Sequence, residues 1–223
     1  MNKQLKLIAT LLVVALCTTT VFTSCRNDDD DNGDGTLEIR ATNIANLPNE
    51  IRASIETVRV EIDGYIIGEA PFGNSFTLEL RSMPSRFLFP ITEEFPGLTI
   101  NNRSANSLDI EAVVLAFDKD GRDIGVFAYE DIRENDEIIG IWFYVDRNVT
   151  IRGTYNNWVF DLNLRRGWNV AYEHFMDDDT TVRFTSQRPT GANLRWVFRD
   201  WSSWSSHSAT TKATENRNSF FRR

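Results

Sequence analysis

Apolar and polar residues alternate along most of the chain from residue 36 onward. A period of two buries one face of a β-strand and leaves the other in solvent, so each alternating run predicts a strand. The runs recur at intervals of about 8 to 12 residues, which is typical of sandwiches and barrels. We therefore expect an all-β fold, an antiparallel β-sandwich of immunoglobulin-like or jelly-roll-like form. The expected strands lie at 37–39, 58–62, 76–80, 108–116, 149–151, 158–164, 168–172, 182–184 and 194–198.

The segments between these runs have the chemistry of turns and leave little room for helices. Glycine at positive φ, or aspartate bonded to its own backbone, lets the chain reverse tightly. Residues 48–55 have Pro near their start and apolar residues Ile51 and Ile55 one helical turn apart. We expect at most one short helix, in this segment. The turn signals are Asp63-Gly64, Asp120-Gly121, Arg166-Gly167 and residues 177–179.

The chain changes character near residue 97. All six tryptophans follow this point, and a Pro-rich span over residues 84–96 comes just before it. The span is either a crossover between the two sheets of one sandwich or a boundary between two small β subdomains. We favour the crossover, because neither half alone is large enough for a comfortable core. The sandwich domain is expected over residues 36–199, and residues 200–223, rich in Ser, Thr, Asn and Arg, are expected to be a loosely ordered tail.

The N-terminus has the layout of a secretory signal peptide. A short basic start precedes an apolar run over residues 7–16, and small residues lead up to Cys25. The apolar run is shorter than the ~20 residues that a transmembrane helix requires. We therefore expect a signal peptide over residues 1–24. Residues 25–35, in which Asp, Asn and Gly predominate, are expected to form a solvated acidic tether.

The residues around Cys25 resemble two sorting signals of bacterial lipoproteins. Phe22-Thr23-Ser24-Cys25 resembles a lipobox, in which the Cys is joined to diacylglycerol and becomes the new N-terminus, although Phe22 stands where the motif usually has Leu. The acidic run after it resembles the export signal of surface-displayed lipoproteins in Gram-negative anaerobes. The resemblance implies a lipoprotein acylated at Cys25, for example with palmitate, in the outer membrane and on the cell surface. The acidic run consists of Asp28, Asp29, Asp30 and Asp31.

Several segments of the expected domain resemble a family of β-rich lipoproteins from the same bacterial group, one without an assigned activity. The resemblance extends over about residues 36–199, and the shared residues have the character of strand and turn positions. It supports the fold and the location, and it implies no activity. The segments are 98–102, 116–121, 144–151, 164–169 and 194–198.

Net charge and cysteine content limit the classes of partner and of metal site that we expect. The formal net charge is −8, and removal of Lys3 and Lys6 with the signal peptide leaves −10. An acidic surface repels phosphate backbones and anionic membranes, so we expect no nucleic-acid partner and membrane contact only through the lipid on Cys25. Because Cys17 lies in the signal peptide and Cys25 carries the lipid, the mature domain has no disulfide and no thiolate metal site.

A weak candidate for metal binding is the acidic turn around Gly121. Asp118, Asp120 and Asp123 provide hard oxygen ligands of the kind that Ca²⁺ prefers. A hairpin loop in which Asp bonds to the backbone accounts for them equally well. No other cofactor is expected.

Aromatic residues divide into expected core and expected contact positions. Trp158, Trp168 and Trp196 are in phase with aliphatic neighbours, so we expect them in the core. Tyr155, at a turn, and Trp201 and Trp204, in the tail, are candidates for contact with a glycan or protein ligand. Separately, Asp179-Thr180-Thr181 resembles a short bacterial O-glycosylation signal, with Thr180 as the acceptor.

No catalytic motif is apparent in the sequence. The two histidines are His174 and His207, and no Gly-x-Ser-x-Gly sequence marks a nucleophile. We therefore expect a non-catalytic binding or envelope-interaction module of unknown ligand. The alternatives are an adhesive or structural cell-surface subunit, which would self-associate through strand edges, and a glycan-processing enzyme acting through a carboxylate pair that sequence cannot select.

Overall fold

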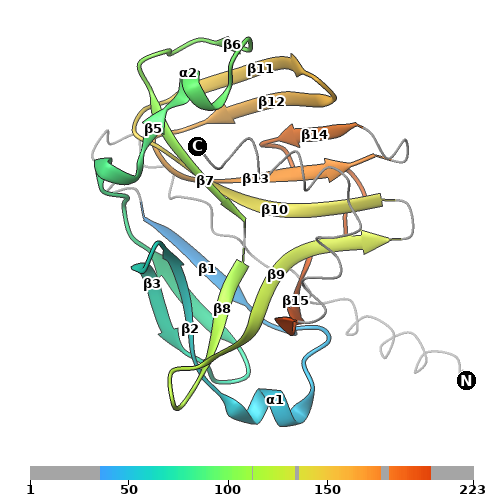
Figure 1. The fold of residues 1–223 in the computed structure, drawn as a ribbon. Coiled ribbons are helices and arrows are strands. Elements are labelled where there is room, and N and C mark those ends of the chain that lie inside the picture. Colours follow the sequence, from blue (N-terminus) through green and yellow to red (C-terminus); the bar gives the residue numbers. More distant parts are fainter. Residues whose placement is uncertain (1–35, 112, 134–135, 177–180, 202–223) are drawn as a thin grey trace, which may run out of the picture.

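The computed structural model describes residues 36–111, 113–133, 136–176 and 181–201. Strands make up most of this part of the chain, and the fold is an all-β sandwich, as the alternation predicted (Figure 1). Before the Pro-rich span lie β1 (Leu37–Ala41), β2 (Ile55–Ile62), β3 (Tyr65–Pro71) and β4 (Phe76–Leu80). The later strands are β5 (Phe89–Pro90), β6 (Thr99–Ile100), β7 (Asn106–Glu111), β8 (Val113–Asp118), β9 (Asp123–Arg133), β10 (Asp136–Val145), β11 (Val149–Tyr155), β12 (Trp158–Leu164), β13 (Gly167–Phe175), β14 (Val182–Thr185) and β15 (Arg195–Arg199).

One thirteen-stranded sheet runs through the described chain in the order β3-β2-β8-β9-β10-β13-β14-β12-β11-β6. β15 pairs with β9, β7 with β10, and β5 with β7, while β1 and β4 form a separate two-stranded sheet. Pairing is antiparallel except between β12 and β14, which are parallel. β10 is central because its first half pairs with β9, its second half with β7, and its other edge with β13.

The hydrophobic core consists of two clusters on opposite sides of β10 and β13. Successive strand residues point to opposite faces, so Trp142 and Tyr144 of β10 belong to the first cluster, and Ile141 and Phe143 to the second. In Figure 1 the first cluster lies below β10, among β1, β2, β8 and β9, and the second lies above it, among β11, β12 and α2. β10 is therefore buried on both faces.

Burial on both faces explains two long strands that the alternation does not predict. β9 and β10 span much of residues 123–145, where no alternating run occurs. Residues 125–131 of β9 are all buried. A strand buried on both sides reads as a continuous apolar run, and the period-two signal disappears.

Helices are short, and one more is present than the sequence predicts. α1 (Asn49–Ser54) lies within the predicted segment. In the Pro-rich span, a 3-10 turn (Ser85–Phe87) and α2 (Ile91–Glu94) each follow directly after a proline. A single helical turn is too short to give a repeating apolar pattern, which is why α2 was not anticipated.

The Pro-rich span takes the chain from the first cluster to the second. Met83, before the span, is buried in the first cluster, whereas Ile91 and Phe95 are buried in the second. Residues after 97 contribute to both clusters. The change of composition near residue 97 therefore does not coincide with a boundary between the two clusters.

The three tryptophans predicted in the core are buried, which confirms that reading of the alternation. Trp158 belongs to the second cluster, and Trp168 and Trp196 belong to the first. The indole Nε1 of Trp168 donates to the carbonyl oxygen of Arg81 at 2.7 Å. Trp142, which the alternation did not assign, is also fully buried.

The two ends of the described chain meet beside the first cluster. Ala45, between β1 and α1, forms a parallel bridge with Val197 of β15. Its N–H donates to the carbonyl oxygen of Trp196, and its carbonyl oxygen accepts from the N–H of Phe198, both at 2.9 Å. Among the described residues, no helix has the length and apolarity needed to cross a membrane.

Candidate ligand-binding surface

The β8–β9 hairpin ends in a turn that is held together by its own side chains. Oδ1 of Asp118 accepts from the backbone N–H groups of Asp120 and Arg122, both at 2.9 Å, and Oδ2 accepts from the Arg122 guanidinium at 2.9 Å. Gly121 takes the positive φ of 74° that the reversal needs. The backbone N–H of Arg122 is the largest influence that holds the pKa of Asp118 below its usual value, and it outweighs the opposing effect of burial.

The three aspartates proposed as calcium ligands are each bound by another side chain of the protein. Asp118 and Asp120 both bind Arg122, the latter at 2.8 Å, while Asp123 accepts a hydrogen bond from Trp201. Among the described residues, no three or more His, Cys, Asp or Glu side chains are grouped so that they could hold a metal ion. The hairpin interpretation of these aspartates accounts for the geometry, and the structure does not bring them together as a calcium site.

Trp201 joins the end of the described chain to the start of β9. It comes two residues after β15, which pairs with β9 from Arg199 opposite Val126 onward. Its indole Nε1 donates to Oδ1 of Asp123, and 41% of the residue remains exposed. The hydrogen bond uses the only polar atom of the indole, so the exposed part of the ring is apolar and its orientation is fixed.

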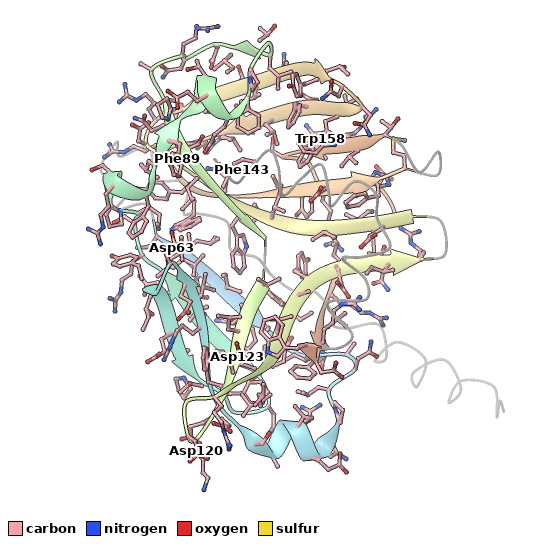
Figure 2. The ribbon with its side chains drawn as sticks, in the orientation of Figure 1. Asp63, Phe89, Asp120, Asp123, Phe143 and Trp158 are labelled. Carbon is pink, nitrogen blue, oxygen red and sulfur yellow. The ribbon has the colours of Figure 1, made fainter. Side chains whose placement is uncertain are left out.

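A stacked arginine lies next to this pair. Asp123 is opposite Phe117 in the β8–β9 ladder, and the guanidinium of Arg59 lies 4.5 Å from the centre of the Phe117 ring. We call Trp201, Asp123, Phe117 and Arg59 the platform. Figure 2 shows Asp120 and Asp123 together at one end of the molecule, where the hairpin turns.

Two carboxylates hold the guanidinium of Arg59 over the ring of Phe117. Its Nε and Nη2 lie 2.7 and 2.6 Å from Oε2 of Glu69, and its Nη1 lies 3.5 Å from Oε2 of Glu61. Cation–π contact and ion pairing together restrict a side chain that would otherwise be mobile. The platform therefore presents groups in fixed positions.

A buried ion pair supports the platform from β15. Nε of Arg199 donates to both carboxylate oxygens of Glu130, at 3.0 and 3.1 Å, and the two side chains are 11% and 4% exposed. Sequence reasoning missed this pair. The available signal is a carboxylate directly after the apolar run 126–129, because a buried charge requires a partner.

Gly125 allows β15 to approach β9 closely enough for these contacts. A Cβ atom at this position would lie 2.6 Å from both the carbonyl oxygen of Arg199 and the ring of Phe198. Only glycine fits between the strands. The position of Trp201 thus depends on the backbone of β9 as well as on its hydrogen bond.

The remaining described candidates lie elsewhere. Tyr155 ends β11, is paired with Trp158 of β12 and packs against the second cluster. In Figure 2, Trp158 lies in the upper half of the molecule and Asp123 in the lower half, so Tyr155, which pairs with Trp158, and Trp201, which binds Asp123, are well separated. His174 lies on β13, opposite Ile138 of β10 and Arg183 of β14.

Several predicted positions lie outside the described residues. They are the lipid-attachment Cys25, the export signal Asp28, Asp29, Asp30 and Asp31, the O-glycosylation candidate Thr180, the tail residue Trp204, and His207.

A second polar network joins the loops at the other end of the molecule, and we call it the Asp146 network. Oδ1 and Oδ2 of Asp146 accept from the backbone N–H and side-chain amide of Asn106, at 2.9 and 2.8 Å. Arg147 binds both oxygens as well and reaches Ser104 at 3.2 Å. Burial acts to raise the pKa of Asp146, but these hydrogen bonds hold it below its usual value. The hydrogen bonds of this network connect loops. None of these bonds holds an exposed aromatic ring in place.

Fold and surface were compared with protein families, with curated proteins and with solved structures. No match was found. The observations that bear on function are therefore the chemistry of the platform and the lipobox-like and acidic segments near the N-terminus.

Proposed function

We propose that this protein is a non-catalytic binding module, anchored in the outer membrane by lipid on Cys25 and displayed on the cell surface, and that it binds its ligand through the platform. The observation that carries the proposal is the Trp201–Asp123 pair. An exposed ring held by a carboxylate offers apolar area at little further cost in conformational entropy, as interface anchors do. The lipobox and the acidic run support the location.

The polar groups of the platform, and those of the adjoining β8–β9 turn, suit binding better than proton transfer. Arg59 and Arg122 each hold two carboxylates, and Asp123 holds the indole N–H. Groups fixed in this way orient a ligand at low entropic cost. We therefore give this surface a recognition role.

Binding is tested with the full chain in detergent on an array of glycans and matrix proteins. Trp201→Ala should weaken any specific hit by about tenfold or more, because a central aromatic anchor contributes about 2 kcal/mol. Tyr155→Ala is the matched control, since it removes an aromatic from the other end of the molecule, and it should leave the hit unchanged. Trp204→Ala is measured separately. Silence of the array with a folded protein, or equal losses in the Trp201 and Tyr155 variants, would contradict the proposed surface.

The anchor is tested by fractionation of cells. Cys25→Ala should move the protein from membranes to the soluble fraction, because acylation contributes about 0.8 kcal/mol for each buried methylene. Replacing Asp28 to Asp31 with Ala should leave it in membranes but protected from protease added to intact cells. A Cys25→Ala protein that still floats with lipid would contradict the anchor, and an unchanged protease sensitivity would contradict the export signal.

A further inference from the structure

The exposed area of the platform is an apolar ring bordered by hydrogen-bonding groups. The Trp201 indole offers carbon atoms to solvent, because its N–H is bound by Asp123. A carboxylate accepts several hydrogen bonds and a guanidinium carries five N–H donors, so Asp123 and Arg59 can each serve more partners than the contacts described. A ligand that matches this surface has an apolar face and hydroxyl groups around its rim.

Charge around the ring disfavours acidic ligands. Arg59 is bound by Glu61 and Glu69, and Arg122 by Asp118 and Asp120, so each group of three carries a net charge of −1. Asp123 adds another negative charge, and Arg199 is bound by the buried Glu130. A sulfate or carboxylate on a ligand would meet guanidinium groups whose positive charge is already compensated by carboxylates, in a chain whose net charge is −8.

We infer that the ligand of the platform is an uncharged carbohydrate that stacks the C–H face of a pyranose ring on the exposed indole of Trp201 and hydrogen-bonds through its hydroxyl groups to Asp123 and Arg59. This inference rests on the proposed function. Aromatic rings with one polar handle are suited to surfaces of this mixed character. Neutral polysaccharides differ from acidic ones in charge while sharing the stacking face, so charge separates the two classes.

The test measures binding of the full chain in detergent to two sets of polysaccharides. The neutral set contains a β-glucan, a mannan and a dextran, and the acidic set contains heparin, hyaluronan and alginate. We expect binding within the neutral set that is unchanged by added salt, because no ion pair with the ligand is formed. Trp201→Ala should lower the affinity about tenfold or more, and Tyr155→Ala should leave it unchanged.

Two further variants separate stacking from charge. Trp201→Phe keeps an aromatic face but loses the hydrogen bond to Asp123, so the affinity should fall less than in Trp201→Ala. Asp123→Asn keeps an oxygen acceptor for the indole while removing the charge. Affinity for a neutral glycan should therefore fall less in Asp123→Asn than in Trp201→Ala, because the stacking face and an oxygen acceptor both remain.

The outcomes divide as follows. Binding confined to acidic polysaccharides and weakened by salt, or a specific protein ligand in place of glycans, would overturn the inference and leave the proposed binding role intact. A neutral-glycan affinity that Trp201→Ala does not change would overturn the stacking. Absence of binding to every glycan and matrix protein, with native circular dichroism, would overturn both the inference and the proposed function.

Discussion

Carboxylates accept hydrogen bonds in two separate regions of the molecule, but the groups that they hold differ. At one end, Asp146 and Arg147 hold loops together, and the exposed ring on the adjoining β5 strand, Phe89, has no polar atom through which such a network could hold it. At the other end, a carboxylate holds Trp201 by its indole N–H and leaves the ring exposed. An exposed aromatic ring held by a carboxylate, rather than the presence of ion pairs, therefore distinguishes the proposed binding surface from the Asp146 network.

The largest expected effect concerns the buried ion pair between Glu130 of β9 and Arg199 of β15. Glu130→Ala should lower the free energy of unfolding by about 3 to 5 kcal/mol, because it leaves the Arg199 guanidinium buried without its partner. Urea denaturation followed by fluorescence measures it. Arg152→Ala is the control at the other end, since the Arg152–Asp161 pair is exposed and should contribute at most about 1 kcal/mol. Equal losses would show that the two ends are supported alike.

Two glycines give a matched comparison of backbone packing. Gly125→Ala should destabilise by about 3 kcal/mol, because its Cβ would meet the backbone of Arg199 at 2.6 Å. Gly153→Ala should destabilise by only about 1 kcal/mol, since its Cβ would meet the flexible end of Leu98 at 3.3 Å and the main penalty is its positive φ. Thermal unfolding compares them, and a larger loss in Gly153→Ala would reverse the expected difference.

The smallest expected effect is on acid stability. The pKa of Asp146 is lowered on folding below its usual value of 3.8, so its contribution to the stability of the fold is complete above that value and is lost as the pH falls through the lower folded pKa. Asp146→Asn should therefore destabilise by about 1 kcal/mol near neutral pH and flatten the loss of stability below about pH 4. Urea unfolding at several pH values tests this. A profile as steep as that of the unmodified protein would contradict it.

Much of the fold could be predicted from the sequence, and its centre could not. β1, β4 and β12 bury alternate residues, and this alternation in the sequence predicts them. β9 and β10 carry no such signal, because a core lies on each side of them. The all-β class followed from the outer strands, whereas the sharing of β10 by two clusters depends on contacts between distant residues.

The candidate surface was predicted in its parts but not in its arrangement. Trp201 and Asp123 were identified for different reasons, as a ligand contact and as a metal ligand, and their hydrogen bond joins residues 78 positions apart. Nothing local encodes that pairing, because it follows from the register of β15 on β9. Arg59 over Phe117 is missed for the same reason. A single sequence shows which residues have side chains suited to binding more readily than it shows which distant residues those side chains contact.

The bridge between Ala45 and β15 has a mechanical consequence. Under the proposed function, which places a lipid anchor at the N-terminus and a ligand at Trp201, tension would enter the domain through β1 and leave it at the end of β15. Ala45 and Val197 pair in parallel, so pulling from these two ends slides one segment along the other and loads both hydrogen bonds of Ala45 at once. Force on a tethered, ligand-bound molecule would thus act beside the first cluster, while the second cluster stays outside the load path.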